Sequence, residues 1–98
     1  MDKSTVIAKL REYEPELKAA GIVRLSLFGS VARGDASSES DVDLMAEFDP
    51  AKEFSLLDMV GLENRLADIL GVRVDLIPER NLKDRSRERV AREAVLAF

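Results

Sequence analysis

Two carboxylates, Asp41 and Asp43, are separated by the single residue Val42 at the start of the apolar run 42–48. Residues two apart on a strand project from the same face, so these side chains are expected to lie close together. Carboxylates held that close repel each other unless a cation lies between them, and oxygen ligands favour hard cations such as Mg²⁺. The pair therefore predicts a site for one or two magnesium ions.

A third carboxylate, Asp75, lies inside the otherwise apolar run 72–77. An ionised side chain is costly to bury without a partner, so Asp75 either faces water at a sheet edge or meets a counter-charge. If the strand at 72–77 lies beside the one at 42–48, Asp75 can face the same ions. Three carboxylates with two divalent ions form the clamp used for in-line displacement at phosphorus.

Upstream of the carboxylates, Gly29 and Ser30 follow the apolar run 22–28. Glycine lets the backbone approach a ligand closely, and Ser30 offers both a hydroxyl and an amide N–H. If residues 30–34 form a short helix, its first amides point at an anion such as a triphosphate. This turn is thus a candidate phosphate site, although a Gly-Ser pair after a strand is more often only a turn.

Arg33 could add positive charge to the phosphates, or it could form a structural ion pair with Asp35 or Glu39. An Asp-x-Asp pair, taken alone, is also more often a solvated strand end. The joint order and spacing of these features is far more specific, and it predicts a metal-dependent site for a nucleoside triphosphate. The chain lacks the Gly-x-x-x-x-Gly-Lys-Ser/Thr motif of P-loops. Residues 35–46 are not a standard EF-hand loop, because Ser40 replaces its turn glycine and Ala46 its closing glutamate.

Composition narrows the chemistry further. The 98 residues predict one domain, 1–98, and the absence of cysteine and histidine excludes disulfides, thiolate or imidazole metal ligands and a histidine base. A formal net charge of −4 argues against direct nucleic-acid binding. No apolar run approaches the ~20 residues that span a bilayer, and no signal-peptide pattern is present, so a soluble cytoplasmic protein is expected.

Besides the short helix after the first strand, helices are expected at three places. Apolar residues at helical spacing cover about 4–19, where Ser4 is a candidate cap and Pro15 predicts a break into two helices. Ser55 and Asp58 resemble a capping box that begins a helix closed by Gly71. A last helix, capped by Asn81, has as its apolar positions Leu82, Val90, Ala94, Val95 and Phe98.

Strands are expected at 22–28, 42–48 and 72–77. In the first of them Val23, Leu25 and Leu27 alternate and are predicted to share one face. Strands that alternate with helices in this order predict a small α/β (α+β) domain, with about three strands in a mixed sheet and helices packed on it. Residues 35–40 are expected to form a loop.

The sequence Phe-Gly-Ser-Val-Ala-Arg-Gly at 28–34, followed by Ser-Asp-Val-Asp-Leu at 40–44, resembles the signature of the minimal nucleotidyltransferase (MNT) family of the DNA polymerase β-like superfamily. Val74-Asp75-Leu76 stands where the family has its third carboxylate. The resemblance implies that Gly29 and Ser30 hold phosphates and that Asp41 and Asp43 hold Mg²⁺. It also implies that Asp75 completes the triad and helps to activate the attacking hydroxyl.

The same resemblance implies transfer of AMP from ATP with release of pyrophosphate. Larger relatives carry an added helical domain for the acceptor, and a chain of this length is expected to find its acceptor outside itself. Minimal members commonly pair with a HEPN-type ribonuclease toxin and act as its antitoxin, in several cases by adenylylating a tyrosine. The resemblance therefore implies a HEPN-type partner protein.

Two other functions stay open at this stage. The chain could neutralise its partner by binding alone, through a charged helix face with the basic residues Lys83, Arg85, Arg87, Arg89 and Arg92. Such a run is more often a solvated helix face stabilised by pairs four residues apart. Modification of a small molecule, as in aminoglycoside nucleotidyltransferases, is disfavoured because no acceptor domain is recognisable.

Overall fold

A computed structural model describes residues 2–34 and 41–98, apart from the side chains of residues 84–86. The described helices and strands follow in the order α1 (Lys3–Glu12), α2 (Glu14–Ala19), β1 (Ile22–Phe28), α3 (Gly29–Arg33), β2 (Val42–Phe48), α4 (Leu56–Leu70), β3 (Val74–Pro78), the 3₁₀ turn η1 (Glu79–Asn81), α5 (Asp84–Glu93) and β4 (Val95–Leu96). The expected loop at 35–40 lies outside the described residues.

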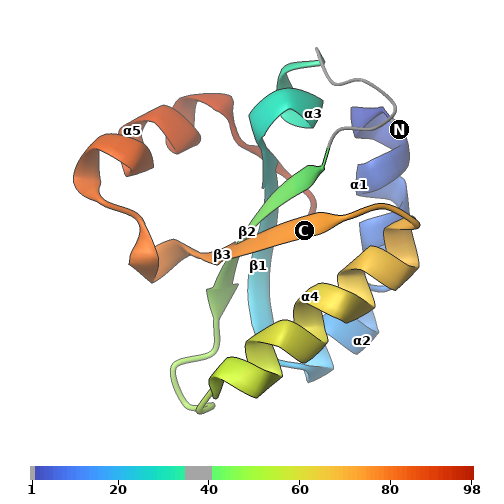
Figure 1. The fold of residues 1–98 in the computed structure, drawn as a ribbon, viewed down its shortest axis with the longest axis vertical. Helices are drawn as coiled ribbons and strands as arrows, with labels where there is room; N and C mark the ends of the chain where they lie inside the picture. The colour runs from blue at the N-terminus through green and yellow to red at the C-terminus, as the bar shows by residue number, and fades with distance from the viewer. Residues whose placement is uncertain (1, 35–40) are drawn as a thin grey trace.

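The strands form one mixed sheet in the order β3-β2-β1-β4 (Figure 1). β1 pairs antiparallel with β2 and with β4, whereas β2 and β3 are parallel and α4 makes the crossover between them. A small α+β domain with a mixed sheet is therefore confirmed. The sheet has four strands where about three were expected.

The fourth strand arises at the segment that was expected to continue the last helix. α5 ends at Glu93, and Ala94 is already extended with ψ of 141°. Beyond it the chain pairs with β1: the N–H groups of Ala97 and Phe98 both donate to the carbonyl of Leu25, and Ala97 is buried. The apolar residues at the end of the chain therefore belong to a strand and the extended residues after it. Their helical spacing in the sequence led to the wrong prediction of a helix.

Two predicted helix caps are also wrong. Asp2, not Ser4, caps α1 and accepts a hydrogen bond from the amide of Thr5 at 2.9 Å. Asn81 lies in η1, and α5 begins after Lys83. The break at Pro15 is confirmed, because proline occupies the first turn of α2.

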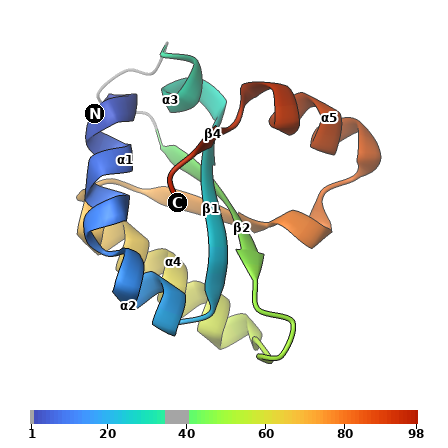
Figure 2. The same cartoon turned by 180° about the vertical axis from the view of Figure 1, so that it is seen from behind.

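One face of the sheet is covered by α1, α2 and α4, and α5 lies on the other side (Figures 1 and 2). The covered face carries the core, in which the largest fully buried side chains are Leu10, Leu17, Ile22, Leu25, Leu27, Leu44, Leu66 and Leu70. Val23 does not share this face as predicted, because an irregularity between Ile22 and Arg24 shifts the register and leaves Val23 48% exposed. Residues of opposite parity, including Asp43 and Asp75, project from the side that faces α5.

β3 is an edge strand, and a side chain from α4 occupies part of its outer edge. The amide of Leu76 donates to the Glu63 carboxylate at 3.0 Å instead of to a neighbouring strand. The contact ties the middle of α4 to the strand that carries Asp75. None of the described helices is both long and apolar enough to cross a membrane.

The capping box at the start of α4 provides a stability test. The Asp58 amide donates to Ser55 Oγ at 3.1 Å, and the Ser55 amide donates to Asp58 Oδ2 at 2.9 Å, which confirms the predicted box. Ser55→Ala is expected to lower the free energy of unfolding by about 1 kcal/mol, because an N-terminal amide of the helix loses its acceptor. Urea unfolding followed by circular dichroism measures the loss. Ser4→Ala is the control, since Ser4 lies inside α1 and provides no cap; equal losses would contradict the assignment.

Candidate active site

The predicted phosphate turn lies where β1 passes into α3. Phe28 is the last residue of β1, and Gly29 follows with a φ of +76°, in the left-handed region that favours glycine. The five-residue helix α3 ends at Arg33 and is capped by Gly34, whose N–H is directed at the carbonyls of Ser30 and Val31. The backbone thus reverses sharply within one turn at the end of a central strand.

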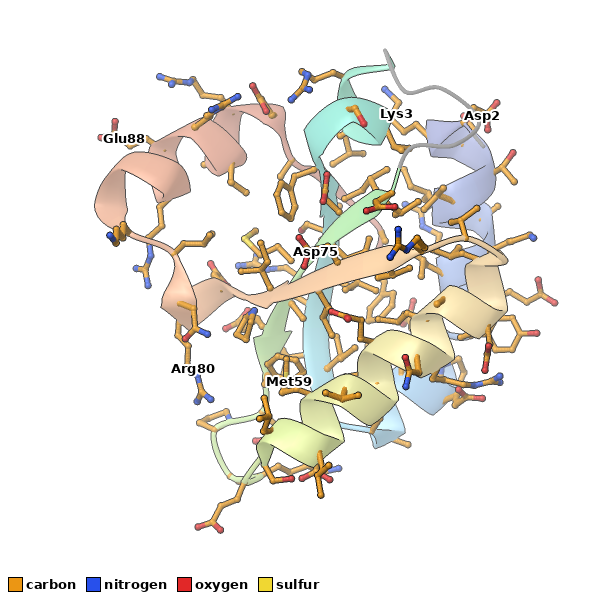
Figure 3. All side chains as sticks on the ribbon, in the orientation of Figure 1. Asp2, Lys3, Met59, Asp75, Arg80 and Glu88 are labelled. Atoms are coloured by element: carbon orange, nitrogen blue, oxygen red, sulfur yellow. The ribbon has the colours of Figure 1, made fainter. Side chains whose placement is uncertain are left out.

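The two predicted strand carboxylates lie side by side in the sheet. Asp43 on β2 pairs in register with Asp75 on β3, and its neighbour on the other side is Phe28 of β1. Figure 3 shows Asp75 on the side of β3 away from α4. Asp43 is half-buried, whereas Asp75 and Asp41, the residue just before β2, are exposed. The sheet therefore places one sheltered and two accessible carboxylates beside the turn at Gly29.

The glycine and the central carboxylate are in direct contact. A Cβ atom built on Gly29 would collide with Asp43 Oδ2, and it would lie 3.0 Å from Asp43 Cγ and 3.2 Å from Asp43 Cβ. A side chain at position 29 would therefore push the Asp43 carboxylate out of its place. Glycine is required here both by its backbone conformation and by this contact.

Negative charge is concentrated around Asp43. Partial burial raises the pKa of the Asp43 carboxyl above its ordinary value, the charges of Asp75 and then Asp41 raise it further, and the charge of Arg33 opposes them. A cation bound near Asp43 would offset the negative charges that disfavour ionisation of this carboxyl. The pKa direction also indicates that all three aspartates and Arg33 are near enough to interact.

A magnesium ion fits this chemistry, although the described residues do not form a finished cage. All the candidate donors are carboxylate oxygens, which suit a hard cation. Within residues 2–34 and 41–98, no group of three acidic side chains is already arranged to hold a metal ion. The aspartates that could do so lie next to one another, so an ion would have to draw the exposed Asp41 and Asp75 towards Asp43.

Arg33 lies at the end of α3, and its guanidinium Nη1 is 3.3 Å from the carboxylate of Glu93 on α5. The expected alternatives, Asp35 and Glu39, lie outside the described residues. Sequence reasoning did not single out Glu93 as a partner, because it is 60 residues away from Arg33 and belongs to no motif. Only the packing of α5 against α3 brings the two together.

A hollow of about 430 Å³ lies elsewhere, between α2 and α4, and contains none of these residues. Its charged residues are already engaged in part: Arg65 makes two bonds to Glu16, at 2.6 and 2.8 Å, and stacks 5.4 Å from the centre of the Tyr13 ring. Because Arg65 and Glu16 already pair with each other, this hollow is a weaker candidate for a ligand site than the cluster of carboxylates around Asp43.

Comparison with known proteins agrees with this geometry. The family model described as the nucleotidyltransferase domain matches residues 7–97. Protein adenylyltransferase MntA of Thermococcus cleftensis is 38% identical over 87 residues, which cover 88% of this chain and 86% of that protein. A Methanocaldococcus jannaschii protein assigned as a protein adenylyltransferase is 38% identical over 85 residues, covering 87% of this chain and 89% of that one.

Solved structures share the architecture. A structure assigned as a minimal nucleotidyltransferase is 47% identical, superimposes with a TM-score of 0.78, and is matched over 97% of this chain and 95% of that one. A chain from the complex of a tri-AMPylated Shewanella oneidensis HEPN toxin with an MNT antitoxin has a TM-score of 0.67 at 18% identity, over 93% of this chain and 70% of that one. This more distant likeness concerns the fold alone. From the family match over residues 7–97 and these close relatives, it follows that the chain belongs to the nucleotidyltransferase domain family.

Proposed function

We propose that this chain is a protein adenylyltransferase, which transfers AMP from ATP to a hydroxyl group of a partner protein. The observation that carries the proposal is the contact between the Gly29 turn and Asp43, with Asp75 in register beside it. A turn suited to phosphate and a cluster of carboxylates suited to a cation are what a nucleotidyl transfer site requires. The close relatives named as protein adenylyltransferases support the choice of a protein acceptor.

Each site residue has a role in this proposal. Asp41, Asp43 and Asp75 would hold Mg²⁺, which when bound would neutralise the phosphate charge. The backbone at Gly29 and Ser30 would hold the triphosphate, and Arg33 would add a positive charge from the end of α3. The turn is suited to this task because Gly29 has no side chain between the backbone and the carboxylate of Asp43.

In the proposed reaction, the acceptor hydroxyl oxygen forms a bond to the α-phosphorus of ATP. The bond from that phosphorus to the oxygen bridging to the β-phosphate breaks, and pyrophosphate leaves with the bonding electron pair. Asp75, which is exposed and adjacent to Asp43, would take the proton of the attacking hydroxyl. Asp43, held between Phe28 and Asp75, would help to keep the attacking hydroxyl and the leaving pyrophosphate in line with the phosphorus.

We infer that the acceptor belongs to a HEPN-type toxin and that the chain acts as the antitoxin in the cytoplasm. The basis is similarity: structures with this fold include an MNT antitoxin in complex with a tri-AMPylated HEPN toxin and a toxin–antitoxin structure with AMP-PNP. A tyrosine hydroxyl is the acceptor that the family resemblance favours.

The test uses ATP labelled at its α-phosphate, Mg²⁺ and a lysate of the source cell. We expect a labelled protein band that appears only when the chain is added, because AMP retains the α-phosphate. The same band should take no label from ATP labelled at the γ-phosphate, because that phosphate leaves with pyrophosphate. The double variant Asp41→Asn/Asp43→Asn, shown to be folded, should give no band. Labelling of that band by the γ-phosphate, or a band that survives the double substitution, would refute nucleotidyl transfer at this site.

Neutralisation of the partner by binding alone is a second candidate function. Leu56 and Leu57, in the first turn of α4, are 81% and 82% exposed, and Val60 beside them is 48% exposed. Large apolar side chains gathered on a surface are typical of protein–protein contacts. If the double aspartate variant rescues growth from a HEPN-type toxin as fully as the wild type does, binding suffices and AMP transfer is not the neutralising event.

A further inference from the structure

Glu93, the last residue of α5, holds arginines with both of its carboxylate oxygens. Its Oε2 lies 3.3 Å from Nη1 of Arg33 on α3, and its Oε1 lies 3.8 Å from Nε of Arg89, one turn earlier on α5. The Glu93 side chain is 29% exposed, less than either arginine. The contact with Arg33 is the shorter of the two and is a hydrogen bond, so Glu93 is an anchor for that guanidinium.

The group that Glu93 holds belongs to the candidate active site. Arg33 is the last residue of the five-residue helix that begins with Gly29 and Ser30, and Gly29 is in contact with Asp43. The guanidinium therefore lies near Glu93, on the same short helix as the turn at Gly29. A guanidinium is a rigid plane of five N–H donors, so an anchor on one nitrogen sets the direction of the others.

The ion pair is poorly suited to a purely stabilising role. The Arg33 side chain is 40% exposed and that of Glu93 is 29% exposed, and ion pairs this accessible contribute little to folding because water and salt screen them. Fixing the long side chain of an arginine before a ligand arrives, however, removes an entropic cost from binding. The pair is therefore better explained by what Arg33 does for a ligand.

We propose that Glu93 is a positioning residue, which holds the Arg33 guanidinium at the end of α3 so that Arg33 meets the phosphates of the bound nucleotide. The inference rests on the proposed function, since it takes a nucleoside triphosphate as the ligand. It assigns α5, a helix outside the signature motif, a part in nucleotide binding. In this arrangement the C-terminal end of α5 sets the direction of a positive charge in the active site.

The test measures binding of AMP-PNP in the presence of Mg²⁺ by titration calorimetry. Glu93→Ala removes the anchor and is expected to weaken binding about five- to tenfold, because Arg33 must then be ordered by the ligand. Glu93→Gln keeps an oxygen acceptor and should bind within about twofold of the wild type. The matched control is Glu88→Ala on the same helix: Glu88 lies on the outer side of α5, away from the sheet (Figure 3), and its loss should change nothing.

A double-mutant cycle then tests whether Glu93 acts through Arg33. Arg33→Ala alone should weaken binding, and Arg33→Ala/Glu93→Ala should be no weaker than Arg33→Ala. If Glu93→Ala binds like the wild type, or weakens binding equally without Arg33, the positioning role is wrong. Should Glu93→Ala fail to fold, Arg89→Ala replaces it: about a twofold loss is expected because Glu93 loses its second contact, and no loss overturns the proposal. Failure of the wild type itself to bind AMP-PNP would instead refute the proposed function.

Discussion

Asp43→Asn is expected to lower AMP transfer to the partner protein by about a thousandfold or more, while the protein stays folded and becomes more resistant to unfolding. Asparagine has nearly the same shape as aspartate, but it carries no charge to hold a cation. Asp43 is the central member of the candidate triad, because it lies between Phe28 and Asp75 in the sheet. Its replacement therefore removes the middle carboxylate of the site. The labelling reaction with α-phosphate-labelled ATP measures the loss.

The gain in stability follows from the direction of the Asp43 pKa. Burial first, and then the charges of Asp75 and Asp41, raise this pKa in the folded protein. The folded state therefore binds the proton more tightly than the unfolded state does. The stability this provides is fully present below the ordinary aspartate pKa and is lost as the pH rises through the raised folded pKa. At neutral pH the ionised Asp43 side chain thus destabilises the metal-free folded state.

Urea unfolding at a series of pH values checks this sign. The wild type should lose stability as the pH rises through the Asp43 titration, and Asp43→Asn should lose less over the same interval. Asp68→Asn, an exposed position on α4, is the control for removing a carboxylate elsewhere. Added Mg²⁺ should stabilise the wild type and not Asp43→Asn, because a cation that binds only the folded state favours it. Retained transfer in Asp43→Asn would exclude this residue from the reaction.

Gly29→Ala is expected to reduce AMP transfer by about a hundredfold, because a displaced catalytic group costs about that much per ångström. The methyl group would occupy the space of the Asp43 carboxylate and shift it. Alanine must also adopt a φ of +76°, which costs about 1 kcal/mol in the left-handed region. The variant should therefore be less stable and far less active.

Gly34→Ala separates these two effects. Gly34 has a φ of +81°, so alanine there suffers similar backbone strain, but an added Cβ would meet no heavy atom of residues 2–34 and 41–98 within 4 Å. We expect Gly34→Ala to lose a similar amount of stability and to keep most of its transfer activity. Measuring unfolding and labelling on the same preparations gives both comparisons. If the two variants lose activity equally, strain in α3, and not displacement of Asp43, is the cause.

Local patterns in the sequence were sufficient to place most of the elements around the site. The strands at 22–28 and 42–48 have the predicted limits, because apolar runs bounded by glycine and polar residues define them. The helix cap at Ser55 could also be predicted from the sequence, since a capping box involves residues only three apart. The adjacency of Asp43 and Asp75 followed from the condition that the two strands lie together, which the parallel pairing of β2 with β3 satisfies.

Features that depend on distant contacts could not be predicted in this way. β4 forms because β1 offers a free edge to Val95 and Leu96, a circumstance that no local spacing reveals. Val23 is exposed because of an irregularity in pairing with β2, although its alternation with Leu25 indicated that the two share a face. The ion pair of Arg33 with Glu93 likewise depends on how α5 packs on α3. The sequence therefore predicted the candidate site residues better than the long-range contacts around them.

The bond from the Leu76 amide to Glu63 bears on how the molecule behaves at high concentration. A bare outer strand is a template on which a strand from another molecule can add, and repeated addition leads to fibrils. Here a carboxylate fills one of the positions that such a strand would need, and its charge repels an approaching backbone carbonyl. β3 can therefore carry Asp75 at the rim of the sheet without making that rim a site of polymerisation.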